Sequence, residues 1–185
     1  MTSALIGLGA NLPSSEGPPE ATLRAALARL AAVGLRVAAV SRFYATQAIP
    51  PGSGPDFVNA AARIETALSP AEVLARLHDV EAALGRVRGT RWAARVIDLD
   101  LLSMDDLVLP DIGTWERWAG LGPEEQQRAQ PDVPILPHPR LQDRAFVLVP
   151  LMEVAPGWRH PVLGRTVAEM LAALPETERL APRPL

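Results

Sequence analysis

The segment from Arg86 to Asp100 combines the residue types that hold a metal ion and phosphate groups. Four arginines and a tryptophan precede an apolar stretch that carries aspartates at positions 98 and 100. In an extended strand, residues two positions apart face the same side, so the carboxylates of Asp98 and Asp100 would lie together. Mg²⁺ prefers oxygen ligands and is commonly held by one or two carboxylates plus substrate phosphates, and guanidinium groups bind phosphate with paired hydrogen bonds. The segment therefore predicts a metal–polyphosphate site.

The same residues also allow a purely structural explanation, in which the aspartates cap a polar sheet edge and the arginines lie on a solvated face. The stretch from Val96 to Leu102 has the composition of a buried strand, and neighbouring carboxylates are costly to bury without a cation. We therefore favour the metal site. Two other classes of function stay open: an Asp-x-Asp glycosyl- or nucleotidyltransferase, and a non-catalytic ferredoxin-like module whose arginines bind an acidic partner surface.

The composition indicates one globular domain over residues 1–185. A net charge of −3 argues against a nucleic-acid partner. The chain has no cysteine, which excludes thiolate metal sites and cysteine nucleophiles, and no lysine, which excludes a P-loop lysine and Schiff-base chemistry. Because no apolar run has the length of a membrane span or the pattern of a signal peptide, we expect a cytoplasmic protein without a membrane partner.

The elements that would position these residues follow a β-α-β-β-α-β order. Alternating apolar residues predict strands, and helical spacing with capping signals predicts helices. The predicted strands span 3–8, 35–46, 57–66 and 96–102, and the predicted helices span 21–33 and 69–84. This order predicts an α+β protein with a ferredoxin-like βαββαβ core. Helices would cover one face of its antiparallel sheet, which leaves the other face or its rim for the site.

The C-terminal part predicts an extension to this core. Residues 105–133 have weak periodicity and suggest a long loop with a short helix at 123–129. Residues 145–152 are apolar enough for a helix or a strand, 166–174 predict a final helix, and the tail 175–185 is expected to be ordered only in part. We expect Trp158 to serve packing and His160 to lie at the surface without a role.

Short motifs over nearly the whole chain resemble, in order, those of the 6-hydroxymethyl-7,8-dihydropterin pyrophosphokinase family. These motifs lie at 7–12, 41–46, 55–61, 84–88, 91–100, 137–141, 144–146 and 149–156. The resemblance implies Mg²⁺-dependent transfer of the β,γ-diphosphate of ATP to the hydroxymethyl oxygen of the pterin, with release of AMP, in folate biosynthesis. ATP and the hydroxymethyl-dihydropterin would then be its small-molecule substrates.

The resemblance also assigns residues to the phosphate chemistry. It implies that Asp98 and Asp100 are the ligands of two Mg²⁺ ions, and that Arg86 and Arg95 are catalytic arginines that neutralise charge on the transferred diphosphate. The ATP contacts that it implies come from His78, Arg88, Trp92, Arg95, His138 and Arg144. Glu81 matches a helix position beside the nucleotide pocket. Without the resemblance, His138 would equally fit a histidine packed into a turn between prolines.

A second group of residues matches the pterin-binding positions of the family. In this group the Asn59 amide pairs with the edge of the pterin ring, Phe57 and Phe146 sandwich the ring, and Trp92 closes over it. Backbone contacts come from Thr46, Ala48 and Ile49. Without the resemblance, both phenylalanines would be assigned to the core.

The chain departs from the family pattern in three places. Its arginine loop is one residue shorter and lacks a lysine that some members carry, and Pro139 replaces an aromatic residue. Asp100 and His138 lie 38 positions apart, well beyond the family's usual spacing. The extra residues, about 112–132, hold Trp115 and Trp118. We expect this insertion to pack over the nucleotide entrance or to form a dimer contact in a chain that is otherwise a monomer.

Overall fold

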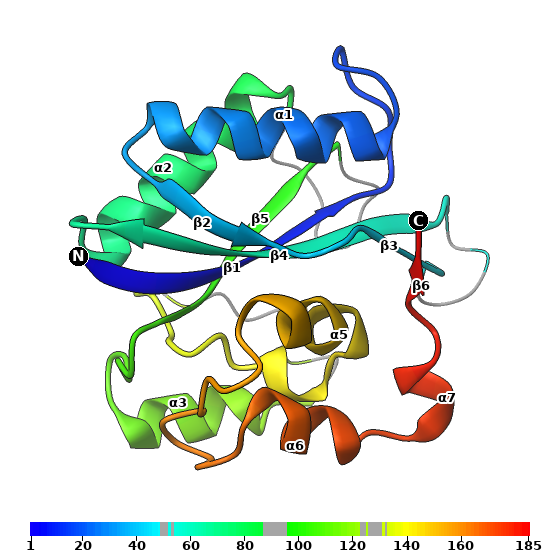
Figure 1. Ribbon diagram of the computed structural model, residues 1–185. Coiled ribbons are helices and arrows are strands. Elements are labelled where there is room, and N and C mark those ends of the chain that lie inside the picture. The colour runs from blue at the N-terminus through cyan, green and yellow to red at the C-terminus, as the bar shows by residue number, and fades with distance from the viewer. Residues whose placement is uncertain (49–51, 53, 87–95, 123–124, 126–130, 132) are drawn as a thin grey trace.

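The computed structural model describes residues 1–48, 52, 54–86, 96–122, 125, 131 and 133–185 (Figure 1). Its strands are β1 (Thr2–Ala10), β2 (Arg36–Val40), β3 (Tyr44–Thr46), β4 (Phe57–Thr66), β5 (Asp98–Met104) and β6 (Arg183–Pro184). Its helices are α1 (Pro19–Ala32), α2 (Pro70–Ala83), α3 (Ile112–Ala119), the 3-10 helix η1 (Leu141–Asp143), α5 (Ala145–Val154), α6 (Val167–Ala172) and α7 (Glu176–Arg179).

The strands form one antiparallel sheet in the order β5-β1-β4-β3-β6, and β2 pairs with β4 beside β3. The first six predicted elements therefore occur in the predicted βαββαβ order, which confirms the α+β class and the ferredoxin-like core. Helix α2 begins at the predicted capping box, in which Ser69 and Glu72 exchange side-chain and backbone hydrogen bonds. It ends before Gly85, whose φ of +88° is the left-handed conformation typical of a helix C-terminus.

Helices cover both faces of the sheet, so the expectation of one open face is wrong (Figure 1). Helices α1 and α2 pack on one face against Ile6, Leu8 and Ile64. Helices α5 and α6 pack on the other face against Leu5, Ala61 and Leu102. The reason lies in α5, whose sequence is apolar almost all round and which must be buried to be stable. The site must therefore lie between the sheet and the α5 layer or at the rim.

The predicted strand 35–46 is in fact two strands, with residues 41–43 between them, although the Ser41 N–H still donates to the Ala61 carbonyl oxygen at 2.9 Å. The Ser41 hydroxyl, rather than a main-chain oxygen, accepts the hydrogen bond of the Ala61 N–H at 2.9 Å. This side-chain contact replaces one regular strand bond and separates β2 from β3.

The C-terminal part is more regular than predicted. Residues 105–133 contain α3, which the Asp111 carboxylate caps by accepting from the Thr114 N–H at 2.9 Å. The expected helix at 123–129 lies almost wholly outside the described residues. The tail forms α7 and β6, so the expectation of partial order is wrong. The segment 145–152 is helical, and the final predicted helix is confirmed as α6.

The expectation for His160 is also wrong, because its side chain is fully buried (0% exposed). Its ring meets Trp115 edge-on at a centroid distance of 4.9 Å and lies 5.6 Å from the ring of Trp158. Trp158 has the predicted packing role. In the described part of the chain, no helix is both long and apolar enough to cross a membrane.

Candidate active site

One row of directly paired residues crosses the sheet from β5 to β3. Asp98 pairs with Gly9, Gly9 pairs with Asn59, and Asn59 pairs with Tyr44. Directly paired residues face the same side of a sheet. The Asp98 carboxylate and the Asn59 amide thus share a face and stand two strand spacings apart, roughly 10 Å.

Glycine at position 9 keeps the space between these two groups open. A Cβ built on Gly9 would lie 3.1 Å from the Asn59 Oδ1, which is tighter than ordinary packing. Any side chain at this position would push on the amide and fill the space between Asn59 and Asp98. The row therefore provides a gap with an amide at one end and a carboxylate at the other.

Asp100 belongs to the next row on the same face, where it pairs with Gly7, and Gly7 pairs with Ala61. Both aspartates are half-buried, whereas Leu99 and Leu101 between and beyond them are buried in the α1–α2 core. The predicted alternation is confirmed: the two carboxylates lie on the face that α5 covers.

Arg86 links Asp98 to a buried glutamate. Its Nη1 donates to the Asp98 Oδ1 at 2.6 Å and also to Glu81. The Glu81 side chain is almost fully buried and accepts from the Leu99 N–H at 2.7 Å, which satisfies an outward-facing N–H of β5. Burial raises the pKa of Glu81 to about 7, although the Leu99 N–H and Arg86 act in the opposite direction. Glu81 thus fixes Arg86 beside the Asp98 carboxylate.

His138 and Arg144 approach the aspartates from the C-terminal part of the chain. The His138 Nδ1 accepts from the Arg140 N–H at 3.1 Å, which leaves its Nε2 to carry the proton. Desolvation, together with the nearby Arg144 charge, lowers the pKa of His138 to about 3, so the ring is neutral near pH 7. Burial lowers the pKa of Arg144, against the attraction of Asp100. Neutral His138 and cationic Arg144 therefore share the electrostatic environment of the aspartates.

Three of the predicted pterin residues, Asn59, Thr46 and Phe57, lie together at the other end of the row. The Asn59 side chain is buried, and its Nδ2 donates to the Thr46 Oγ1 at 2.7 Å. Phe57 lies two positions earlier on β4 and pairs with Thr46, so it faces the same side as Asn59. Phe146 comes from α5, the helix that covers this face, and its ring centroid lies 5.7 Å from the Arg144 guanidinium carbon. Both phenyl rings are half-buried and Ala48 is buried.

Some predicted residues are not brought together by the described structure. Ile49, Arg88, Trp92 and Arg95 lie outside the described residues. His78 is exposed on α2, three residues before Glu81. From the sequence, Glu81 was expected only to lie beside the nucleotide pocket, and its contact with Arg86 was missed. The sequence does carry a signal for a buried carboxylate at this position. Glu81 continues the buried stripe of Val73, Leu77 and Val80 along α2, where a carboxylate needs a partner.

The donor set at Asp98 and Asp100 fits Mg²⁺. Across the described residues, no group of three or more histidine or acidic side chains is arranged to hold a metal ion by itself. Two carboxylates are the usual protein contribution to a Mg²⁺ site whose remaining ligands are phosphate oxygens and water. The site is therefore suited to a metal that arrives with a polyphosphate.

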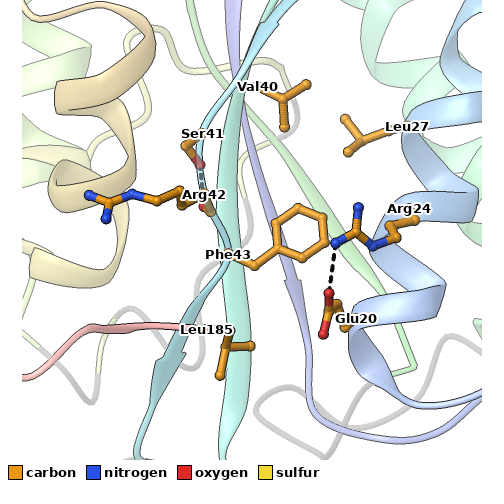
Figure 2. A pocket seen from close by; sticks show the side chains of 8 residues that line it. All are labelled: Glu20, Arg24, Leu27, Val40, Ser41, Arg42, Phe43 and Leu185. Carbon is orange, nitrogen blue, oxygen red and sulfur yellow. Dashed lines mark hydrogen bonds and ion pairs between the residues drawn. The ribbon is translucent and has the colours of Figure 1, made fainter.

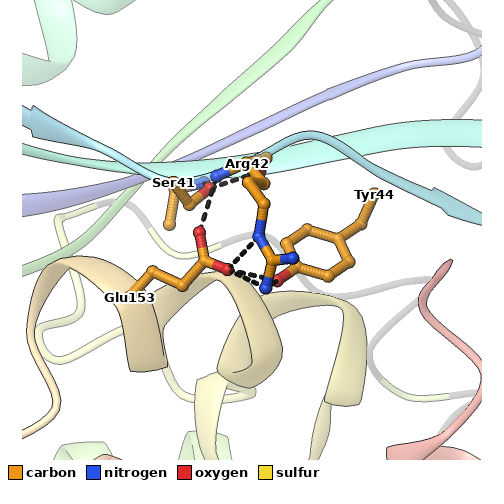
Figure 3. A network of polar contacts seen from close by, with 5 residues as sticks. Ser41, Arg42, Tyr44 and Glu153 are labelled. Carbon is orange, nitrogen blue, oxygen red and sulfur yellow. Dashed lines mark hydrogen bonds and ion pairs between the residues drawn. The ribbon is translucent and has the colours of Figure 1, made fainter. Parts of the chain in front are cut away.

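A polar network ties the end of α5 to β3 on the same face (Figure 3). The Arg42 main-chain N–H and its Nε each donate to a Glu153 oxygen at 2.7 Å. The Tyr44 hydroxyl donates to the Glu153 Oε1 at 2.5 Å. Burial would raise the pKa of Glu153, but the Tyr44 and Arg42 donors outweigh it and lower the pKa. The network therefore fixes the helix that carries Phe146 relative to the strand that pairs with Asn59.

A separate recess of about 420 Å³ lies beside α1 (Figure 2). Its lining includes Leu27, Val40 and Phe43, and the Arg24 guanidinium carbon lies 4.9 Å from the Phe43 ring centroid. Arg24 is already paired with Glu20 at 2.7 Å. None of the predicted site residues lines this recess. The recess is therefore distinct from the candidate active site.

The ferredoxin-like fold, with the Asp98 and Asp100 carboxylates and the Asn59 amide on one face, is the arrangement expected of a metal-dependent enzyme that transfers phosphate groups. The model of one family, 7,8-dihydro-6-hydroxymethylpterin-pyrophosphokinase, matches residues 5–156. The chain belongs to this family, as its motifs predicted.

Curated relatives support this assignment. The chain is 41% identical over 178 residues to a 2-amino-4-hydroxy-6-hydroxymethyldihydropteridine pyrophosphokinase from Methylorubrum extorquens, covering 94% of each protein. It is 36% identical over 169 residues to the Synechocystis protein of the same name, covering 91% of this chain and 74% of that protein.

Solved structures share the fold. A Plasmodium falciparum HPPK-DHPS chain superimposes with a TM-score of 0.66 at 16% identity, over 97% of this chain and 46% of that one. The chain thus spans less than half the length of that protein. At this level of identity the comparison shows the fold alone.

Proposed function

We propose that this chain carries out the reaction of its family on the sheet face between Asp98 and Asn59. The reaction is the ATP-dependent transfer of a diphosphate to 6-hydroxymethyl-7,8-dihydropterin in folate biosynthesis, which releases AMP. The observation that carries the proposal is the row Asp98–Gly9–Asn59. It sets a metal-binding carboxylate and a ring-recognising amide on one face with no side chain between them.

Asp98 and Asp100 would hold two Mg²⁺ ions together with the phosphate oxygens of ATP. When bound, Mg²⁺ neutralises phosphate charge and lowers the pKa of a coordinated hydroxyl. Arg86, held by Glu81, supplies a fixed positive charge for the diphosphate, because its pKa is raised by Asp98 and Glu81 despite burial. Arg95 is proposed to act with it.

On the nucleotide side, we assign ATP contacts to Arg144 and His138, with His78, Arg88 and Trp92 as further candidates. A neutral His138 with its proton on Nε2 can donate a hydrogen bond to a phosphate oxygen without adding charge. Arg144 supplies a charged, planar donor. His138 would thus donate a hydrogen bond without charge, whereas Arg144 would neutralise phosphate charge.

On the acceptor side, the Asn59 amide both donates and accepts, which matches the edge of an aminopyrimidinone ring. Its bond to Thr46 fixes the orientation of the amide. Phe57 and Phe146 come from the sheet and from α5, so a flat ring between them would be stacked from both layers. Ala48, Ile49 and Trp92 complete the proposed pterin site.

Product analysis distinguishes this reaction from its alternatives. The protein is incubated with ATP, Mg²⁺ and the hydroxymethyl-dihydropterin, and the products are identified by chromatography and mass. AMP and a diphosphorylated pterin in equal amounts support the proposal. Pyrophosphate or a nucleoside diphosphate as product would instead indicate a nucleotidyl- or glycosyltransferase, and the absence of turnover would indicate a binding module.

We also propose that the protein acts as a monomer, because the row and the residues around it come from one chain. Its co-substrate ATP supports a cytoplasmic location. Sedimentation equilibrium across a range of protein concentrations tests the first point, and a concentration-dependent mass would contradict it.

A further inference from the structure

Helix α3, which opens the segment 112–132, packs against the turn that carries His138. Beside this turn, the N–H groups of Leu109 and Leu136 donate to each other's carbonyl oxygens at 2.9 and 3.2 Å. Pro137 and His138 follow this bridge directly. The Leu109–Leu136 bridge therefore lies directly before the residues of the candidate active site at 137 and 138.

Helix α3 contacts Pro137 through Trp115. The Trp115 side chain is only 3% exposed, and its Nε1 donates to the Pro137 carbonyl oxygen at 2.7 Å. The His138 N–H, in turn, donates to the Leu102 carbonyl oxygen of β5 at 2.7 Å. The Pro137 oxygen and the His138 N–H belong to a single peptide group.

That peptide group is thus held from two sides. The C=O and N–H of a trans peptide point in opposite directions, so α3 holds one side and β5 the other. The orientation of this plane sets the direction in which the His138 side chain leaves the backbone. The indole is itself immobilised by edge-on packing against the buried His160.

We propose that Trp115 is a positioning residue for ATP binding: it orients the Pro137–His138 peptide so that the imidazole faces the phosphates. This inference rests on the proposed role of His138 as a phosphate contact. It gives the insertion a function in the reaction, although no residue of α3 touches a substrate in the proposed arrangement.

The test is Trp115→Phe, which keeps an aromatic ring and removes the single donor. The dissociation constant of the Mg²⁺ complex of α,β-methylene-ATP is measured by calorimetry, and that of the pterin by fluorescence. We expect the nucleotide constant to rise about fivefold, the effect of one hydrogen bond, and the pterin constant to change by less than about twofold.

Trp158→Phe is the matched control. Trp158 belongs to the same aromatic cluster, and its Nε1 donates to a different main-chain oxygen, that of Asp105, at 3.2 Å. This variant should leave nucleotide affinity unchanged. Equal losses in the two variants, or equal losses for both substrates in Trp115→Phe, would show a general packing role and overturn the proposal.

A double-variant cycle with His138→Ala separates this inference from the proposed role of His138. If Trp115 acts through His138, Trp115→Phe has no further effect on nucleotide affinity once the imidazole is removed. Additive losses would overturn the inference while the role of His138 stands. If His138→Ala leaves nucleotide affinity intact, the inference about Trp115 and the proposed role of His138 are both wrong. Should Trp115→Phe not fold, benzothienylalanine at position 115 removes the donor with almost no change in shape.

Discussion

The hydroxyl of Tyr44 donates to the Glu153 carboxylate at 2.5 Å, which joins β3 to the last turn of α5. Tyr44 pairs with Asn59 across the sheet, and Phe146 lies two helical turns before Glu153. The two proposed walls of the pterin site are thus connected through Glu153, which Arg42 also contacts (Figure 3).

Tyr44→Phe removes this contact and retains the ring. We expect the free energy of unfolding to fall by about 1 kcal/mol, the typical net value of one hydrogen bond, and the KM for the pterin to rise two- to threefold with the KM for ATP unchanged. Urea unfolding and steady-state kinetics measure both. Arg36→Gln on β2, which breaks an exposed ion pair to Glu65 of β4, is the control and should change neither KM. A change confined to stability would show that the contact does not position the pterin.

Asp98→Asn should reduce turnover at least about 100-fold, because the variant would lose a proposed metal ligand and the charge that holds Arg86. The Mg²⁺ concentration needed for half-maximal binding of the ATP analogue should rise as well. Asp106→Asn, at an exposed turn after β5, serves as the control. Near-normal turnover in Asp98→Asn, with the fold intact by circular dichroism, would remove Asp98 from the metal site.

Glu81 should make stability depend on pH in the direction opposite to a surface carboxylate. Its pKa of about 7 in the folded protein lies above the ordinary 4.5, so folding favours the protonated form. Its contribution to the free energy of unfolding is therefore intact below about pH 4.5 and decreases as the pH rises to about 7.

The variant Glu81→Gln keeps an acceptor for the Leu99 N–H and cannot ionise. Relative to the parent protein it should become more stable as the pH rises from 5 to 7.5, by a few kcal/mol at most. Urea unfolding at several pH values measures the difference. A constant difference across this range would show that Glu81 is ionised throughout.

His160 should weaken the fold in acid. Burial lowers its pKa from 6.5 to about 4, so its neutral form is favoured in the folded protein. Its contribution is complete above about pH 6.5 and is lost progressively as the pH falls to about 4. His160→Asn retains an acceptor for the N–H groups of Val162 and Leu163 and removes the titration.

Between pH 6.5 and 4, the parent protein should therefore lose about 3 kcal/mol more stability than His160→Asn does. His138 also has a lowered pKa and contributes the same trend to both proteins, so only the difference is informative. Parallel curves for His160→Asn and the parent would contradict the prediction.

Local patterns in the sequence were sufficient to predict most of the core and part of the site. The alternation in residues 96–102 places Asp98 and Asp100 on one face, and the capping box at Ser69 gives the start of α2. The position of Asn59 opposite Asp98 could not be predicted in this way, because it depends on the register of β1 against two strands distant in sequence.

The two expectations that were wrong, for His160 and for the second layer of helices, have the same cause. His160 stands between an arginine and a proline and resembles a surface residue, yet it packs against Trp115 of α3, 45 positions earlier in the chain. The second helical layer was missed because α5 is apolar on almost all sides. Its sequence therefore does not show which side of the helix packs on the sheet. Both features depend on contacts between distant segments, which a local pattern does not encode.

The contact between Trp115 and Pro137 also affects how this chain can evolve. The Pro137 carbonyl is buried, and a buried acceptor that loses its partner costs about 1–3 kcal/mol. A chain without α3 would leave this carbonyl without its donor. A shortened descendant would therefore need a replacement donor before it could lose α3.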